Sequence, residues 1–178
     1  MADTQYEKTE ALSRTARLLG DAAMEKLSGA HVLLFGVGGV GGYVCEALVR
    51  SGVGEITLVD PDKVALSNFN RQIIATMDTL GQYKTEAAAA RVRSINPHCT
   101  VHQRREFYLP EIGDTYDFAG YDYVVDAIDT VSAKIDIIIK AQALGIPVIS
   151  CMGTGNKLQP ELFVLMIYII LPYVLYVA

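Results

Sequence analysis

The sequence predicts an α/β protein with a Rossmann-like, doubly wound and mostly parallel sheet. Short apolar runs alternate with segments of helical periodicity, and a glycine-rich turn follows the first apolar run. Such alternation is typical of βαβ units, in which helices connect parallel strands. With 178 residues and 51% hydrophobic content, the chain can bury one substantial core. We therefore expect one domain over residues 1–163, followed by an apolar tail over residues 164–178.

The expected strands are short apolar runs bounded by turn residues. The run His31–Phe35 ends at Gly36, which indicates a buried strand that leads into a turn. The other expected strands are residues 55–60, Thr100–Arg104, Tyr123–Asp126 and residues 147–151.

Helices are expected between these strands. The first begins at Val40, after which apolar residues recur at helical spacing. The second, Lys84–Ile95, contains four consecutive alanines, the residue with the highest helix propensity. The third covers residues 132–144, with Ser132 as its expected N-cap and Gly145 just beyond its end.

A glycine-rich turn joins the first strand to the first helix. Its sequence, Gly36-Val37-Gly38-Gly39-Val40-Gly41, fits the G-x-G-x-x-G fingerprint in the strand-turn-helix context that the fingerprint requires. The first glycine permits the tight turn, the second lets the backbone approach a phosphate, and the third lets the helix pack closely. Asp60, at the end of the next strand, and Asp62 are candidates to accept hydrogen bonds from ribose hydroxyls. The turn predicts nucleotide binding and leaves NAD, FAD and ATP open.

A polar motif in the loop after the second strand argues for phosphate chemistry. The motif reads Ser67-Asn68-Phe69-Asn70-Arg71-Gln72. Backbone N–H groups and a helix N-terminus suffice to hold a dinucleotide, so a dehydrogenase needs no guanidinium group here. Lys84 opens the next helix and Asp129 follows the fourth strand, which places both at the carboxyl edge of the sheet.

These charged residues match the needs of a triphosphate. Arg71 and Lys84 can neutralise charge that develops on the phosphates, while Asp129 can hold a magnesium ion that bridges their oxygens. The alternative from another class is an NAD-binding oxidoreductase or a non-catalytic nucleotide-binding module. In either of those proteins, the three charged residues would have no task.

Charge and cysteine content limit the choice of partners and compartment. A net charge of −5 disfavours nucleic-acid binding over the whole surface, although a local group of Arg and Lys is compatible with a polyanion. The polar N-terminus is no secretory signal, and the three cysteines fit no paired zinc-ligand spacing. We therefore expect a cytoplasmic protein, in which Cys45 and Cys151 are small core residues rather than nucleophiles.

With these motifs in place, the chain resembles the ThiF/MoeB/HesA superfamily of adenylating enzymes, over about residues 14–163. Three segments are most similar to its tRNA threonylcarbamoyladenosine dehydratase branch. They are Arg14-Thr15-Ala16-Arg17-Leu18-Leu19-Gly20, the glycine turn with Phe35 before it, and Cys151-Met152-Gly153-Thr154-Gly155-Asn156-Lys157-Leu158.

The resemblance implies ATP and Mg²⁺ as cofactors, tRNA as a substrate and a homodimer. It implies that the threonyl carboxylate of the modified adenosine is adenylated and that a ring then closes with loss of AMP. It places Arg17 in the partner's site and assigns catalytic roles to Arg17, Arg71, Lys84 and Asp129, with Asp129 as the metal ligand. The positions that it implies around ATP are Asp60, Asn68, Arg71, Gln72, Lys84 and Asp129. The alternative within enzymes is the activation of the C-terminus of a ubiquitin-like sulfur-carrier protein, which would be a sulfur-transfer partner.

The apolar tail does not follow the family pattern. Residues 162–178 carry no charge and are interrupted by Pro172, whereas a membrane-spanning helix needs about 20 apolar residues. The resemblance implies a Cys-Pro-Leu-x-Arg-like segment here, and one back-translation read in a neighbouring frame recovers it. We therefore expect a truncated or frameshifted product after about Phe163, ahead of a membrane anchor or a buried strand. No membrane partner is expected unless the tail is genuine.

Overall fold

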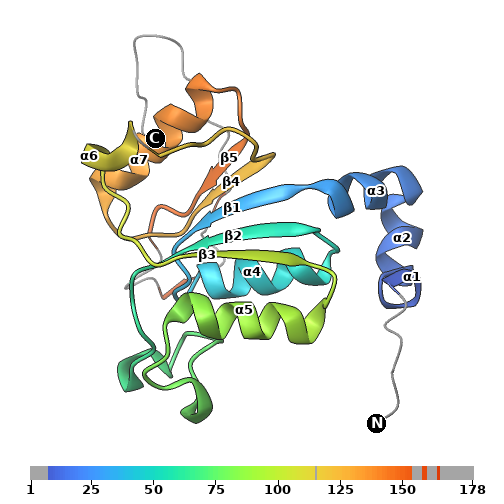
Figure 1. Cartoon of the computed structure of the whole chain (residues 1–178), viewed down its shortest axis with the longest axis horizontal. Coiled ribbons are helices and arrows are strands. Elements are labelled where there is room, and N and C mark those ends of the chain that lie inside the picture. Colours follow the sequence, from blue (N-terminus) through green and yellow to red (C-terminus); the bar gives the residue numbers. More distant parts are fainter. Residues whose placement is uncertain (1–7, 115, 154–157, 160–163, 165–178) are drawn as a thin grey trace.

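The strands of the computed structural model, which describes residues 8–114, 116–153, 158–159 and 164, form one parallel sheet of five (Figure 1). The order across the sheet is β3-β2-β1-β4-β5. The first three strands are added toward one edge, and β4 and β5 are then added on the other side of β1, so the strand order reverses between β1 and β4. The strands are β1 (His31–Phe35), β2 (Glu55–Val59), β3 (Thr100–Arg104), β4 (Tyr123–Asp126) and β5 (Val148–Ser150). The predicted Rossmann-like fold class is confirmed.

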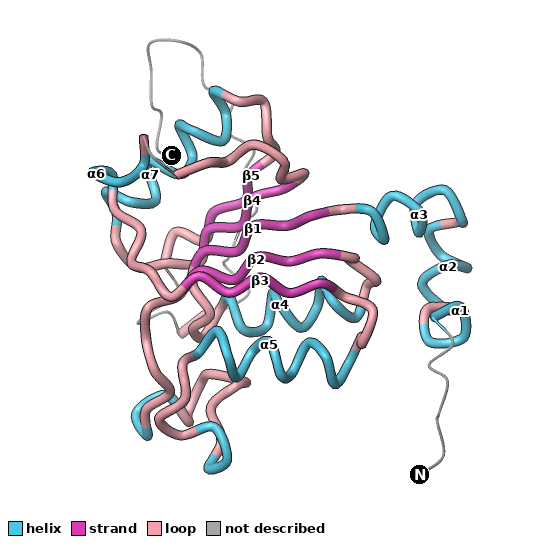
Figure 2. The backbone as a smooth tube through the Cα atoms, in the orientation of Figure 1, coloured by secondary structure: helices cyan, strands magenta, loops and turns pink. Residues whose placement is uncertain are grey.

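Helices cover both faces of the sheet (Figures 1 and 2). One face carries α4 (Gly41–Arg50) and α5 (Lys84–Ile95), and the other carries α6 (Pro110–Gly113) and α7 (Val131–Ala143). The first helices extend beyond the amino end of β1: α1 (Lys8–Ala11), α2 (Ser13–Leu19) and α3 (Asp21–Gly29). The long loop between β2 and α5 contains two short turns of 3₁₀ helix, η1 (Leu66–Asn68) and η2 (Met77–Thr79).

The core forms two apolar layers, one on each face of the sheet. Alternate residues of β1 enter opposite layers: Val32 and Leu34 pack on the α4–α5 side, while Leu33 and Phe35 pack on the α6–α7 side. The central strand is therefore apolar on both faces, which explains why it appears in the sequence as a continuous hydrophobic run.

The element boundaries agree with the sequence except at a few ends. The predicted strands 55–60 and 147–151 are each shorter in the structure, where β2 ends at Val59 and β5 covers Val148–Ser150. The prediction of Ser132 as an N-cap is wrong: α7 begins at Val131, because the carbonyl oxygen of Thr130 accepts the first helical hydrogen bond from Lys134. Gly145 ends this helix with a left-handed φ of 69°, as expected.

The tail of residues 165–178 and residues 154–157 of the third family segment lie outside the described part of the chain. The prediction for the tail and the domain boundary at residue 163 therefore stay predictions. Within the described residues, no helix has the length and apolar character needed to cross a membrane.

Candidate functional site

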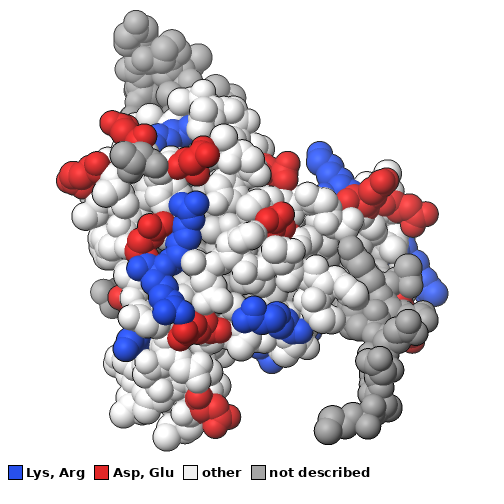
Figure 3. All heavy atoms as spheres, viewed as in Figure 1, with Lys and Arg blue, Asp and Glu red and all other residues white. Residues whose placement is uncertain are grey.

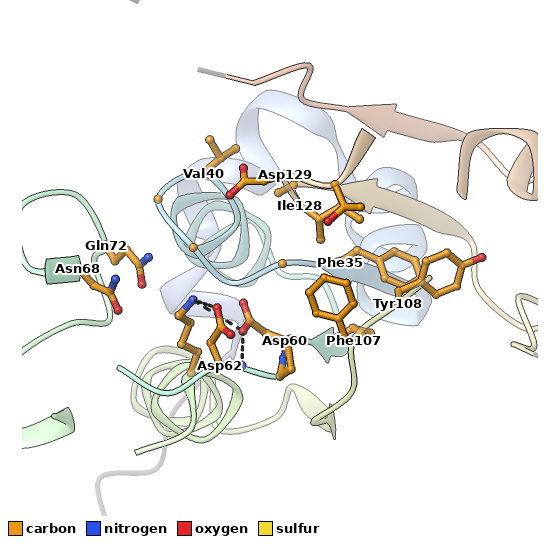
Figure 4. A pocket seen from close by; sticks show the side chains of 18 of the residues that line it. Phe35, Val40, Asp60, Asp62, Asn68, Gln72, Phe107, Tyr108, Ile128 and Asp129 are labelled. Carbon is orange, nitrogen blue, oxygen red and sulfur yellow. Dashed lines mark hydrogen bonds and ion pairs between the residues drawn. The ribbon is translucent and has the colours of Figure 1, made fainter. Parts of the chain in front are cut away.

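A cavity of about 760 Å³ lies at the carboxyl edge of the sheet, beside the point where the strand order reverses. Ligands bind at this position in open α/β sheets. Its walls come from the glycine turn, the ends of β2 and β4, the motif loop and the start of α5 (Figure 4). The predicted site residues that line it are Gly36, Gly38, Gly39, Asp60, Asp62, Asn68, Arg71, Gln72, Lys84 and Asp129.

The glycine turn has no room for side chains at two of its positions. Gly36 has a φ of 85°, and a Cβ there would lie 2.7 Å from the carbonyl oxygen of Ala127. A Cβ on Gly41 would lie 2.9 Å from the carbonyl carbon of Gly36 and nearer still to its oxygen. These are the roles expected of the first and third glycines, the tight turn and the close packing of the helix. A Cβ on Gly38, by contrast, would have one neighbour within 4 Å, the side-chain amide nitrogen of Gln72 at 3.7 Å.

Asp60 holds the glycine turn in place. It is 5% exposed, and its two carboxylate oxygens accept the backbone N–H groups of Val37 at 2.8 Å and Asp62 at 2.9 Å. Burial raises the pKa of this carboxyl, while the two N–H donors and the Lys84 ammonium oppose that shift. Asp60 therefore positions the loop that surrounds the cavity, a role beyond the ribose contact that the sequence suggested.

Lys84 is a nearly buried cation at the start of α5. Its side chain is 8% exposed, and its Nζ lies 2.7 Å from Oδ2 of Asp62 and 3.8 Å from Oδ1 of Asp60. The Asp62 side chain is 63% exposed, so this carboxylate can be solvated when the lysine changes partner. Lys84 thus presents its charge in a poorly solvated position, where electrostatic attraction is stronger than in water.

The motif loop contributes three side chains with different roles. Asn68 is buried, and its side-chain oxygen accepts the backbone N–H of Ala65, which closes the turn η1. Arg71 is exposed, and its guanidinium group donates to the backbone oxygen of Ser67 at 3.0 Å. Gln72 is buried, and its Oε1 has no hydrogen-bond partner in the described part of the chain. A buried acceptor without a donor is uncommon in folded proteins, and this one belongs to a side chain that lines the cavity.

Asp129 is exposed in the loop after β4 and lines the cavity on the Val40 side of the glycine turn, apart from Asn68 and Gln72 (Figure 4). A buried ion pair that the sequence analysis missed holds this loop. The Asp126 carboxylate receives the Lys134 ammonium at 2.9 Å and the backbone N–H of Ile128 at 3.1 Å. The sequence contained a signal for this pair. Asp126 ends an apolar strand, and Lys134 lies on the buried face of the next helix.

The remaining wall is aromatic, which the sequence analysis also missed. Phe107 is 54% exposed at the cavity, while Tyr108 beside it is buried and donates its hydroxyl to Asp136 at 2.6 Å (Figure 4). An exposed aromatic ring at a pocket wall offers a flat apolar surface for a planar group such as a nucleobase.

Arg17 does not line the cavity. It lies on α2, at the amino end of the sheet, whereas the cavity lies at the carboxyl edge (Figure 1). Its expected role concerns the site of a second chain and stays a prediction.

Of the two cysteines discussed above, Cys45 belongs to the core, as expected, and burial raises its pKa to about 12, which leaves it a thiol. Cys151 is half-buried just after β5, so its assignment to the core is only partly correct.

Comparisons with known proteins agree with this geometry. The ThiF family matches residues 12–164 of the chain. The chain is 44% identical over 144 residues to tRNA threonylcarbamoyladenosine dehydratase of Haemophilus influenzae, covering 81% of this chain and 55% of that protein. It is 43% identical over 151 residues to the Bacillus subtilis protein of the same name, covering 85% and 59%.

A similar solved structure contains a nucleotide. It is the Escherichia coli tRNA N6-threonylcarbamoyladenosine dehydratase in complex with ATP, with a TM-score of 0.83 at 40% sequence identity. The match covers 86% of this chain and 63% of the other. This chain therefore spans less than two thirds of each of the three proteins.

Proposed function

Because the chain belongs to the ThiF family, we propose that its cavity binds ATP and catalyses adenylation of a substrate carboxylate. One observation carries the proposal: an exposed arginine and a nearly buried lysine meet a glycine turn at the switch point of the sheet. A dinucleotide that is bound without any reaction at its phosphates needs no such pair of cations. The similar E. coli structure in complex with ATP supports the choice of nucleotide.

We propose that the carboxylate is the threonyl group of threonylcarbamoyladenosine in tRNA, as the names of the similar proteins suggest. An oxide ion is a poor leaving group, so direct loss of water from this carboxylate is slow. A carboxylate oxygen that attacks the α-phosphorus displaces pyrophosphate and forms an acyl adenylate. The neighbouring carbamoyl group then attacks the acyl carbon, loses a proton, closes a ring and releases AMP. Proximity within one nucleoside favours the second step.

The charged residues of the cavity have different roles in this reaction. Arg71 and Lys84 stabilise the charge that develops on the departing pyrophosphate. When phosphate replaces Asp62 as the partner of Lys84, the exposed Asp62 carboxylate becomes available to a ribose hydroxyl or to water. Asp60 keeps the glycine turn in position through its bond to Val37.

The exposed carboxylate of Asp129 on the cavity wall suits a magnesium ion, which binds through one or two carboxylates, phosphates and water. When bound, Mg²⁺ would neutralise phosphate charge. The residue's own contribution is an oxygen ligand, whose loop is held by the Asp126–Lys134 pair.

We also propose a cytoplasmic homodimer in which Arg17 reaches the partner's cavity, as the family resemblance implies. For the tRNA, basic side chains near the cavity offer phosphate contacts. Lys63 and Arg105 flank the ring of Tyr83, at 4.9 Å and 4.4 Å from its centroid, just before α5. On the face seen in Figure 3, basic groups are interspersed with acidic ones, which favours a local contact over general attraction.

The test is product analysis with radiolabelled ATP and tRNA that carries threonylcarbamoyladenosine. We expect AMP and pyrophosphate only with the modified tRNA, and a nucleoside product lighter by one water molecule. The full-length H. influenzae protein serves as the positive control, and unmodified tRNA as the negative control. ADP as the product would refute adenylation. AMP formation with a sulfur-carrier protein, and none with modified tRNA, would favour the alternative substrate.

A further inference from the structure

A cluster of possible metal ligands lies at the amino edge of the sheet, away from the cavity. His31 is the first residue of β1, Glu55 is the first residue of β2, and His102 lies in β3. His31 is paired in register with Glu55, and His102 with Thr57, so the three side chains occupy neighbouring strands on one face. Of the described residues, these three are the ones that group as a candidate metal site, with ligand atoms within 4.8 Å of one another.

The ligand atoms are close to the spacing that a tetrahedral ion requires. Bonds of about 2.0 to 2.2 Å to nitrogen and oxygen place such ligands roughly 3.4 Å apart. Oε1 of Glu55 lies 3.6 Å from Nδ1 of His31 and 2.6 Å from Nε2 of His102. The first spacing needs no change, and the second must open by less than about 1 Å. Glu55 and His102 are 38% and 50% exposed, which leaves both side chains free to adjust.

His31 is already oriented as a metal ligand. Its Nε2 lies 2.9 Å from the hydroxyl oxygen of the buried Thr57, and its ring packs 4.5 Å from the ring of Tyr121, centroid to centroid. A proton on Nε2 that is donated to Thr57 leaves the lone pair of Nδ1 directed toward Glu55. Metal-bound histidines commonly use such an outer hydrogen bond to fix their tautomer and ring orientation.

We propose that His31, Glu55 and His102 form a binding site for a divalent transition ion such as Zn²⁺, with the fourth position open to water. Two imidazoles and one carboxylate are a ligand set that zinc accepts, and they suit Mg²⁺ poorly. The site contains no cysteine. His31 and Phe35 are at opposite ends of β1, about 13 Å apart at 3.3 Å per residue, so this ion is separate from one bound at Asp129. Its occupancy would link the first residues of β1 and β2 to the middle of β3.

The experiment is a Zn²⁺ titration of the full chain in competition with a chromophoric chelator, without nucleotide and with a phosphine reductant. We expect saturable binding of one ion per chain at micromolar concentrations. His102→Gln and His31→Gln should each weaken binding by more than about 10-fold, and Thr57→Val by about 10-fold through loss of the outer hydrogen bond. His102 is half-exposed on its strand, so His102→Gln should leave the fold intact, as circular dichroism without zinc will verify.

The matched control is His98→Gln, because His98 is the remaining histidine of the three in the chain and is exposed before β3. It should bind zinc as the native chain does. The absorption spectrum with Co²⁺ should lack a thiolate charge-transfer band. Absence of saturable binding, unchanged affinity in His102→Gln, loss of binding in His98→Gln, or a thiolate band would each overturn the proposal.

Discussion

Two glycines of the same turn, Gly41 and Gly38, should respond in opposite ways to substitution by alanine. A methyl group on Gly41 would lie 2.9 Å from the carbonyl carbon of Gly36 and closer to its oxygen. Both are backbone atoms, which cannot rotate away as the end of a side chain can. A methyl group on Gly38 would have its nearest neighbour, the side-chain amide of Gln72, at 3.7 Å, an ordinary van der Waals contact.

The expected magnitudes follow from these contacts. Overpacking a closely packed site costs about 1 to 3 kcal/mol, and the methyl group on Gly41 would meet the backbone of Gly36. We therefore expect Gly41→Ala to lower the free energy of unfolding by about 3 kcal/mol. Gly38→Ala should change it by less than about 1 kcal/mol, because nothing in the fold has to move. Its methyl group enters the cavity instead, where the proposed phosphates must approach the backbone.

Urea denaturation and ATP calorimetry on both variants separate the two effects. Gly38→Ala should keep the native unfolding midpoint and bind ATP at least about 10-fold more weakly, a loss of about 1.4 kcal/mol. Gly41→Ala should shift the midpoint strongly. Native ATP affinity in Gly38→Ala would refute the placement of phosphate at this turn. Native stability in Gly41→Ala would refute the packing role of the third glycine.

Three further substitutions test the charged groups. Lys84→Met should lower the rate of AMP formation by about 10²- to 10³-fold, because a donor to developing charge is lost; a loss below tenfold would contradict its catalytic role. Lys134→Met should lower the free energy of unfolding in urea by about 3 to 5 kcal/mol, because it leaves Asp126 buried without its cation, and a change below 1 kcal/mol would argue against that. Hydrogen bonds from Arg91 hold the pKa of Glu46 at about 2, below its ordinary value of 4.5. The ionised carboxylate therefore stabilises the fold above pH 4.5, and this contribution is lost as the pH falls toward 2. Glu46→Gln should flatten that part of the stability profile, and an unchanged profile would exclude the pair as its source.

The sequence was sufficient for the features that depend on local pattern. Period and turn chemistry predicted every described strand and three of the helices that cover the sheet, α4, α5 and α7, but not the short α6. The fingerprint located one wall of the cavity. The N-cap of α7 was missed because Thr130 and Ser132 are both good caps by residue type, and the Thr130 side chain makes no cap hydrogen bond that cap chemistry could have predicted. The aromatic wall at Phe107 was missed for a similar reason, since the segment after β3 approaches the cavity only in the folded chain.

The two buried lysines, Lys84 and Lys134, occupy similar positions and differ in the exposure of their carboxylate partners. Asp60 directly follows β2 and Asp126 ends β4, the strands on either side of β1. Each carboxylate accepts a backbone N–H from a loop at the cavity, and each lies near a lysine from a following helix. Lys134 lies 2.9 Å from its carboxylate, which is completely buried, so it cannot leave without exposing an uncompensated charge. Lys84 instead makes its short contact with Asp62, which is 63% exposed and can be solvated alone. A phosphate can therefore compete for Lys84 and not for Lys134, which is why we propose a catalytic role for the first lysine and a structural role for the second, in the loop that carries Asp129.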